Sequence, residues 1–399
     1  MKYISERTTI PVPRLFGYGF KDDNPTGLPF MIMEYIDGVS LFTVDFDGLD
    51  DKQRTHLHGQ LADIFIQLHL QQFDRIGSLT LDRDDSSWTF GESRPLTIDI
   101  NDQEIDGLDV ARIIGPDQTY GSTIDYIYTL MQLVFNQFLR GRHSVYSEKD
   151  ARWELYGLHK FRALLMEYVL PEYNHGPFVL MHGDFRSSNI MMDENLNIVS
   201  VIDWEWSRTV PAQLFVPPEW LTGYEVNGLL SVYNKLHYMR ELFNFRSAVW
   251  DRERSLKQEN ALPAVPLSKL WRTVDDDATF FIAHALLRFH VLGDIYWDCL
   301  DRRYYGTDPE GRINDFYDAQ ATECQLEIVK KKLDDLAIYK KELEDSGIEK
   351  DQPREPSKTA QARHDSLKTI KREGNEVKGL VALLSNSGAF SALLPLSWR

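Results

Sequence analysis

The chain has 399 residues, of which 43% are hydrophobic and 12% aromatic, enough for a substantial core and one or two domains. Its formal net charge of -17 at pH 7 argues against binding to nucleic acid and to anionic membranes. No apolar run approaches the length of a membrane span, and the two cysteines, Cys299 and Cys324, have no paired spacing. The composition predicts a protein of a reducing compartment without disulfides or a zinc site, and the cytoplasm is its default location.

The predicted elements divide the chain into three parts, 1–36, 37–345 and 346–399. The first part contains two predicted strands, 14–20 and 29–35, joined by a turn-rich segment. The second part has mainly helical apolar spacing, with an irregular acidic insertion expected over 82–106. Its helices are predicted over 53–73, 122–140, 151–169, 229–257, 268–292 and 325–343. The third part is a charged tail that is expected to be disordered.

The most informative segment runs from His182 to Glu205 and reads H-G-D-F-R-S-S-N-I-M-M-D-E-N-L-N-I-V-S-V-I-D-W-E. Short apolar runs predict strands over 178–181, 190–192 and 198–202. A turn-like D-E-N separates the last two runs, so they are expected to form a hairpin. The hairpin would bring the polar residues at its start and at its end close together.

The spacing of three polar residues in this segment matches a phosphoryl-transfer site. Asp184 precedes Asn189 by five residues, as in the catalytic loop of protein kinases, and Asp203 follows an apolar strand. In such a site one Asp accepts the proton of the attacking hydroxyl, while the Asn and the second Asp bind magnesium on the nucleotide phosphates. The alternative is a hairpin whose polar residues only cap turns.

This segment resembles the aminoglycoside phosphotransferase and choline-kinase-like family, in which H-G-D replaces H-R-D and I-D-W replaces D-F-G. Further blocks that resemble the family lie over 10–19, 29–38, 61–79 and 217–221. The resemblance implies an α+β, protein-kinase-like fold with a shortened N-terminal β lobe. Residues 1–36 would be the remnant of that lobe with the hinge. Residues 37–345 would form a large, mainly helical C-terminal lobe with catalytic β-hairpins.

The resemblance also implies a reaction, the transfer of the ATP γ-phosphoryl group to a hydroxyl of a small-molecule alcohol or amine-alcohol. Its cofactors would be ATP and Mg2+. Asp184 would be the base that orients the hydroxyl, and Asn189 and Asp203 would bind the magnesium ion. The oligomeric state does not follow from the resemblance.

Other residues of the implied site have supporting roles. The backbone of Glu34, Tyr35 and Ile36 would receive the adenine, as the hinge does in relatives. His182 is expected to support the loop through hydrogen bonds rather than to transfer protons. Arg186 allows two interpretations, which are contact with a phosphate and pairing with a local acid.

The sequence lacks features that active relatives carry before the I-P-V-P block at 10–13. No glycine-rich loop with its phosphate-binding Lys precedes this block, and Gly17-Tyr18-Gly19 lacks the third glycine. Three hypotheses follow: an active kinase from a truncated gene model, a catalytically impaired pseudokinase, or an interaction module. The expected truncation of the N-terminus leaves a mitochondrial location open. As a further hypothesis, the chain resembles the mitochondrial-inheritance branch of fungal relatives, whose biochemistry the motif does not define.

Two helical segments also allow alternatives. Asp294, Asp298 and Asp301 surround Tyr296 and Trp297 and could form an anionic, aromatic pocket for a cationic substrate. A solvated helix face is the competing interpretation. The amphipathic segment 325–343 could bind a partner, but packing on its own domain is expected because the segment is short for a coiled coil.

Overall fold

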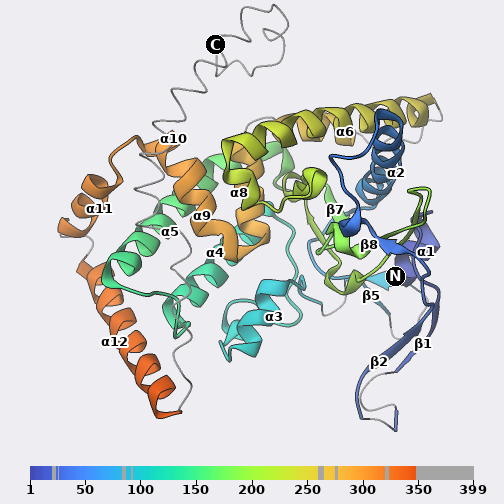
Figure 1. Ribbon diagram of the computed structural model, residues 1–399. Helices are drawn as coiled ribbons and strands as arrows, with labels where there is room; N and C mark the ends of the chain where they lie inside the picture. The colour runs from blue at the N-terminus through green and yellow to red at the C-terminus, as the bar shows by residue number, and fades with distance from the viewer. Residues whose placement is uncertain are drawn as a thin grey trace, which may run out of the picture.

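The computed structural model describes residues 1–19, 24–25, 27–82, 87–90, 93–258, 265–274, 277–319 and 323–346. Small antiparallel sheets lie on one side of the molecule and most helices on the other (Figure 1). This arrangement confirms the predicted α+β class, although helices and short strands alternate along the chain up to β10, and only the part after β10 is entirely helical in the described residues. Apart from Ser346, the tail predicted over 346–399 lies outside the described residues.

The bounds of the regular elements are as follows. The helices of the described residues are α1 (Lys2–Arg7), α2 (Asp51–Leu70), α3 (Ile98–Ile105), α4 (Thr123–Arg140), α5 (Glu148–Tyr168), α6 (Val232–Gln258), α7 (Leu267–Leu270), α8 (Asp277–Leu287), α9 (Leu292–Ile295), α10 (Asp301–Tyr305), α11 (Pro309–Asp318) and α12 (Glu323–Asp345). The strands are β1 (Leu15–Gly19), β2 (Phe30–Met33), β3 (Val39–Ser40), β4 (Gln72–Phe73), β5 (Thr80–Leu81), β6 (Trp88–Thr89), β7 (Phe178–Met181), β8 (Ile190–Met192), β9 (Ile198–Val201) and β10 (Arg208–Pro211).

The two predicted N-terminal strands pair antiparallel as β1 and β2 and form a sheet of their own. This hairpin extends away from the helices at the lower right of Figure 1. All four side chains of β2 are exposed, which is unusual for a strand as apolar as F-M-I-M. The ring of Phe30 lies over Gly19 on the neighbouring strand, where an added Cβ would be 2.6 Å from the ring. The boundary predicted at residue 36 stays a prediction.

Two three-stranded sheets carry the segment 178–211. In one sheet β7 lies between β10 and β4, and in the other β8 lies between β3 and β9, with all pairs antiparallel. The strands predicted over 178–181, 190–192 and 198–202 are confirmed, and the last ends at Val201. Strand β7 is fully buried except for Met181, as expected of a continuous apolar run in the centre of a sheet.

Helix α2 contacts β7 and packs along α6, which is visible at the top of Figure 1. A capping box starts the helix, since Asp50 accepts a hydrogen bond from Gln53 N and the Gln53 side chain accepts one from Asp50 N. Its buried face includes Leu57, Leu61 and Phe65.

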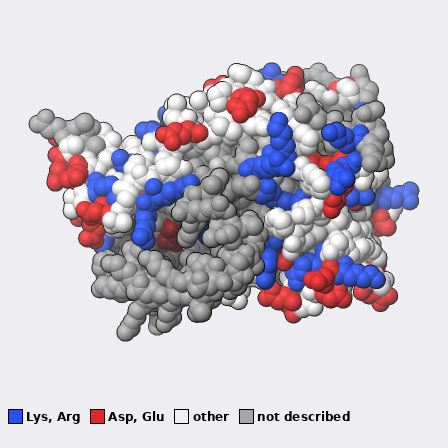
Figure 2. All heavy atoms as spheres, turned by 90° about the horizontal axis from the view of Figure 1, so that it is seen from above, with Lys and Arg blue, Asp and Glu red and all other residues white. Residues whose placement is uncertain are grey.

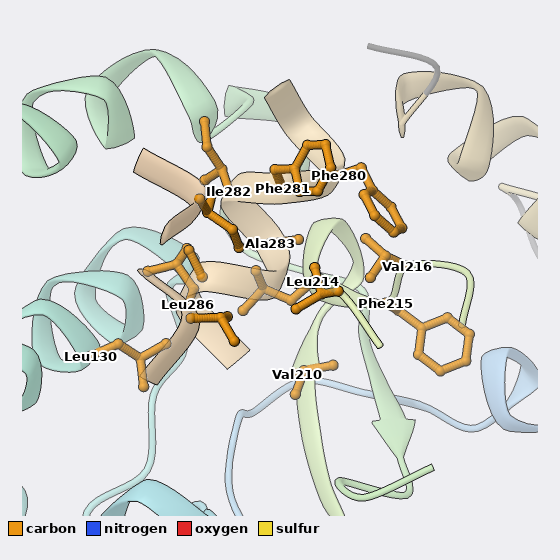
Figure 3. Close-up of a cluster of buried hydrophobic side chains, with 14 of the residues drawn as sticks. Leu130, Val210, Leu214, Phe215, Val216, Phe280, Phe281, Ile282, Ala283 and Leu286 are labelled. Carbon is orange, nitrogen blue, oxygen red and sulfur yellow. The ribbon is translucent and has the colours of Figure 1, made fainter. Parts of the chain in front are cut away.

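A second part of the core lies between α8, α4 and the chain that follows β10. Figure 3 shows Phe280 of α8 next to Val216, and Leu286 of the same helix between Leu130 and Leu214. The prediction of one helix over 268–292 is wrong, because the segment divides into α7, α8 and α9. Tertiary contacts break it, since Arg288 after α8 pairs with Glu219 and Phe289 N donates to the half-buried Asp99.

The predicted irregular insertion over 82–106 is also partly wrong. It contains β6 and α3, and Thr97 caps α3 by accepting a hydrogen bond from Ile100 N. Toward the end of the described chain, α12 packs on α5 through the buried Val329 and Leu336, which confirms the prediction of packing on its own domain. None of the described helices combines the length and the apolar composition that a membrane span needs.

Candidate active site

The loop after β7 begins with a sharp change of direction at Gly183. This residue has φ +87°, and an added Cβ would be 2.1 Å from the carbonyl oxygen of Trp206. Only glycine adopts this conformation without strain and leaves room for the neighbouring backbone. The Gly of H-G-D therefore lets the loop pass closely over the segment that follows Asp203.

His182 joins the two strand ends of the site. Its side chain is completely buried, its Nε2 donates to the carbonyl oxygen of Ile202 at 2.9 Å, and its Nδ1 accepts from Asp184 N at 3.3 Å. Burial lowers the pKa of His182 to about 4, so the imidazole is neutral near pH 7 and both hydrogen bonds fit one tautomer. Since Ile202 precedes Asp203, this imidazole sets the distance between the two aspartates.

Asp184 is 3% exposed and receives two side-chain hydrogen bonds. Arg186 Nη2 donates to its Oδ2 at 2.8 Å, and Asn189 Nδ2 donates to the same oxygen at 3.2 Å. The Asn189 amide also donates to the backbone oxygen of Asp184 at 2.9 Å, which fixes the five-residue loop. Within the described residues, the side-chain hydrogen bonds of Asp184 all go to Oδ2, so Oδ1 remains for another donor.

Asp203 lies at the end of β9 in a left-handed conformation, with φ 68° and ψ 49°. Its carboxylate is exposed, and no described residue hydrogen-bonds it. Ile202 N donates to the carbonyl oxygen of Asn189 at 3.0 Å, which places Asp203 next to the start of β8. The hairpin therefore brings Asn189 and Asp203 together, as the sequence spacing predicted.

The pKa of Arg186 reflects the negative charges of the site. The hydrogen bond with Asp184 is the main cause that raises the pKa of Arg186, and the charges of Asp184, Glu225 and Asp203 add to it. Both aspartates therefore lie within electrostatic range of one half-exposed guanidinium. Glu225 was missed at the sequence level, because an acidic residue in an exposed loop after the 217–221 block has no distinguishing spacing.

The predicted hinge reaches the site through β3. Ser40 Oγ donates to the carbonyl oxygens of Ser187 and Ser188 at 3.3 and 3.2 Å. Upstream, Glu34 N donates to the carbonyl oxygen of Arg14, and the Glu34 carboxylate accepts from Arg14 N at 3.1 Å. No described residue forms a hydrogen bond with the Glu34 carbonyl or the Ile36 amide, and the Tyr35 side chain is 89% exposed.

Trp220 is a second residue that the sequence did not single out. Its indole Nε1 donates to the carbonyl oxygen of Phe185 at 2.6 Å, and the two rings lie 6.0 Å apart, centroid to centroid, with their planes tilted by 37°. The block at 217–221 thus holds the far side of the catalytic loop. In the sequence, the block at 217–221 shows a family resemblance, but it does not indicate which carbonyl the Trp220 indole would bind.

The acidic residues 294, 298 and 301 do not form an open anionic pocket. Asp301 is 3% exposed, pairs with Arg312 and accepts a hydrogen bond from Tyr296 at 2.8 Å. Its charge is thus neutralised inside the packing of α5, α10 and α11. The interpretation of these three acids as a joint binding site for a cation is wrong for Asp301.

The donor set for a divalent cation consists of hard oxygens. Asp203 offers an exposed carboxylate, and Asn189 offers Oδ1, because its Nδ2 is directed at Asp184. In the described part of the chain, no group of three or more His, Cys, Asp or Glu is placed to hold a metal. Magnesium accepts such a sparse set, since it usually binds one or two protein oxygens together with phosphates and water.

Comparison with known proteins gives one family and several remote likenesses. The model of the phosphotransferase enzyme family (APH) matches residues 1–212. Clavilactone A biosynthesis cluster protein Y from Ampulloclitocybe clavipes is 28% identical over 243 residues, covering 57% of this chain and 53% of that protein. The match thus spans about half the length of this relative.

Solved aminoglycoside phosphotransferases are similar at a lower level. APH(2'')-Ib, solved with ADP bound, is 14% identical with a TM-score of 0.35, covering 84% of this chain and 80% of its own. APH(4)-Ia is 14% identical with a TM-score of 0.36, covering 75% of this chain and 81% of its own.

Proposed function

Because this chain belongs to the phosphotransferase enzyme family, we propose that it transfers the γ-phosphoryl group of ATP to a hydroxyl of a small molecule. The observation that carries the proposal is the cluster around Asp184, in which a buried carboxylate is fixed by Asn189 and Arg186 next to the exposed Asp203. A hairpin with polar turn residues alone would not need a buried carboxylate.

Asp184 is the group that accepts the proton of the attacking hydroxyl. Its Oδ2 is held by two donors, and its Oδ1 is left for the hydroxyl of the acceptor. His182 positions this carboxylate without taking part in the proton transfer, since both of its ring nitrogens are engaged. The catalytic effect is mainly orientation, which is the main contribution of proteins to phosphoryl transfer.

Magnesium, when bound, supplies positive charge to the phosphates. Asn189 Oδ1 and the Asp203 carboxylate would hold it, which fits their hard oxygens and their common position at the start of β8 and the end of β9. Arg186 is half-exposed and lies near the same carboxylates, so it can turn from Asp184 toward a phosphate oxygen. Both interpretations of Arg186 then describe two states of one side chain.

The adenine is proposed to bind the Glu34 carbonyl and the Ile36 amide. The support for this position is that the Glu34 amide is already bound to Arg14, and that β3 ties the segment to Ser187 and Ser188. The adjacent polar groups are thus held at a fixed position relative to the catalytic loop.

The test is Mg-dependent ATP binding to the full chain, measured by calorimetry. Asp203→Asn should weaken binding of ATP at least tenfold in the presence of magnesium and have little effect without it. Glu194→Gln is the matched control, because Glu194 is exposed in the same hairpin and carries the same charge. Equal affinity of the wild type and Asp203→Asn would contradict the assignment. Binding that is never followed by turnover with any alcohol would favour the nucleotide-binding pseudokinase.

A further inference from the structure

Helix α6 carries a column of large apolar side chains that is open to solvent. Leu236, Phe243 and Trp250 recur every seven residues and are 56%, 63% and 46% exposed. Seven residues complete almost two helical turns, so these three side chains lie on one face of the helix. Figure 1 shows α6 at the upper edge of the molecule. We call these three residues the apolar column.

The apolar column is not the side of α6 that packs on the core. Tyr238, Phe245 and Val249 are the buried side chains of this helix, and Tyr238 Oη donates to the carbonyl oxygen of Pro218 at 3.1 Å. A surface helix usually combines one apolar face with one polar face. Because α6 is apolar on two sides, its outer face has the character of a surface that binds another molecule.

A second column, partly basic, runs beside the apolar one. It consists of Tyr233, Arg240, Ser247 and Arg254, which also recur every seven residues. Each lies three or four positions from a member of the apolar column, so the two columns are neighbours on the helix surface. The Arg254 guanidinium lies 4.6 Å from the centre of the Trp250 ring, which joins the two columns.

The exposed charges of α6 are mainly positive, although the whole chain has a net charge of -17. The exposed basic residues of this helix are Arg240, Arg252, Arg254 and Lys257, and its one exposed acid is Asp251. Asp63 already pairs with Arg252 at 2.5 Å. Salt screens surface charges beyond about 8–10 Å, so a molecule bound at the two columns meets this local positive charge and not the net charge of the chain.

We propose that the two columns bind an acidic amphipathic helix of another protein. Columns that repeat every seven residues are the geometry in which two helices pack along a common seam. The partner helix places apolar side chains on the apolar column and carboxylates on Arg240 and Arg254. These arginines are two heptads apart, which is roughly 21 Å along the helix axis. The partner therefore carries two acidic residues with the same spacing in its own seam.

The same observations disfavour two other occupants. In a pair of α6 helices from two copies of the chain, exposed arginines would approach each other, and like charges at an interface weaken binding. A lipid surface would accept exposed aromatic and basic side chains, but it requires neither a seven-residue repeat nor a fixed distance between Arg240 and Arg254.

The probe is a fluorescein-labelled synthetic helix of three heptads, with Leu in its seam except for two Glu placed two heptads apart. A second peptide has Lys in place of both Glu. Fluorescence anisotropy with the full chain should show saturable binding of the acidic peptide and at least tenfold weaker binding of the basic one. The double variant Arg240→Glu/Arg254→Glu should reverse this preference, because attractive and repulsive charges exchange places.

The apolar column is tested with Phe243→Ser/Trp250→Ser, which should weaken the acidic peptide at least tenfold. Tyr128→Ser/Tyr146→Ser is the matched control, since it removes two exposed aromatic rings outside α6 and should leave the affinity unchanged. All substituted side chains are exposed, so circular dichroism should show the same fold in every variant. No nucleotide is present, so the result does not depend on phosphoryl transfer by the chain.

Equal affinity of the two peptides for the wild type, an unchanged preference in Arg240→Glu/Arg254→Glu, or no saturable binding would each overturn the inference. Two further measurements identify the other occupants. Sedimentation velocity would assign the face to a second copy if the wild type formed a dimer that Phe243→Ser/Trp250→Ser abolished. Vesicles of equal parts phosphatidylcholine and phosphatidylserine would assign it to a lipid surface if they bound the wild type but not this variant. Either result would also overturn the inference.

Discussion

At the scale of single residues, close contacts decide which side chains the site accepts. Gly183 passes over the Trp206 carbonyl, His182 bridges Asp184 and Ile202, and Asn189 closes the five-residue loop. The contacts of Gly183 with Trp206 and of His182 with Ile202 use a backbone group of another segment. A substitution therefore disturbs two parts of the site at once, which predicts large effects for small changes of side chain.

Gly183→Ala should destabilise the fold strongly. A left-handed conformation costs a non-glycine residue about 1–2 kcal/mol, and the new Cβ would also collide with backbone that cannot move easily. Gly107→Ala is the control, because Gly107 has φ +72° but nothing within 4 Å of an added Cβ. Chemical denaturation should show a clearly larger loss of unfolding free energy at position 183, and equal losses would refute the collision.

His284 predicts a loss of stability in acid. Its folded pKa is about 4, below its unfolded value of about 6.5, so the unfolded state binds more protons between these values. The neutral ring stabilises the fold above pH 6.5, and this contribution falls as the pH drops toward 4, by about 2 kcal/mol at pH 5. The difference between the unfolding free energies at pH 7 and at pH 5 should be smaller in His284→Gln than in His290→Gln. The same fall in both variants would show that other groups are responsible.

At the scale of elements, tertiary partners set where helices stop. The segment 268–292 has an apolar pattern long enough for one helix, yet helix α8 ends at Leu287. It ends there because Arg288 leaves the helical conformation, with φ −146° and ψ 99°, and pairs with Glu219. By contrast, α2 starts where its own capping residues Asp50 and Gln53 place it. Local signals thus fix the start of α2, whereas a partner far along the chain fixes the end of α8.

Arg288→Met should destabilise the protein by about 3–5 kcal/mol, because it leaves the buried Glu219 without its partner. The double variant Arg288→Met/Glu219→Gln should recover much of this loss, since the unpaired charge is then gone. Chemical denaturation of the wild type, both single variants and the double variant gives the coupling energy directly. Additive losses would mean that the ion pair contributes nothing beyond packing.

At the scale of the whole molecule, the parts differ in how far their apolar side chains are buried. The helical part and the sheets around β7 and β8 are buried, whereas the β1–β2 hairpin extends outward with exposed apolar side chains (Figure 1). On the face shown in Figure 2, acidic and basic side chains are interspersed, so the net charge of -17 does not form one continuous acidic surface there.

The rates of amide hydrogen exchange should reflect this difference in burial. Amides of β1 and β2 should exchange at least tenfold faster than those of β7 and β8, because a two-stranded sheet without packing opens locally. Mass spectrometry of the full chain resolves the two regions as separate peptides. Comparable protection of both would show that the hairpin is covered in solution.

The sequence by itself determined the local features of this protein. Apolar periodicity predicted strands over 178–181, 190–192 and 198–202 and a helix over 53–73, which the structure has at 178–181, 190–192, 198–201 and 51–70. The order of Asn189 and Asp203 predicted that a hairpin would bring the two residues together. These features depend on residues close in sequence, where periodicity and turn chemistry act directly.

Only the tertiary structure decided what depends on residues far apart. The break after Leu287, the burial of Asp301 by Arg312, the hold of Trp220 on the catalytic loop and the unpartnered nitrogen of His284 each arise from contacts between distant segments. A one-dimensional pattern records the apolar face of a helix but not which partner meets it. The physical reason is that burial and pairing are properties of the packed chain, so acidic residues with similar spacing can end in water or in an ion pair.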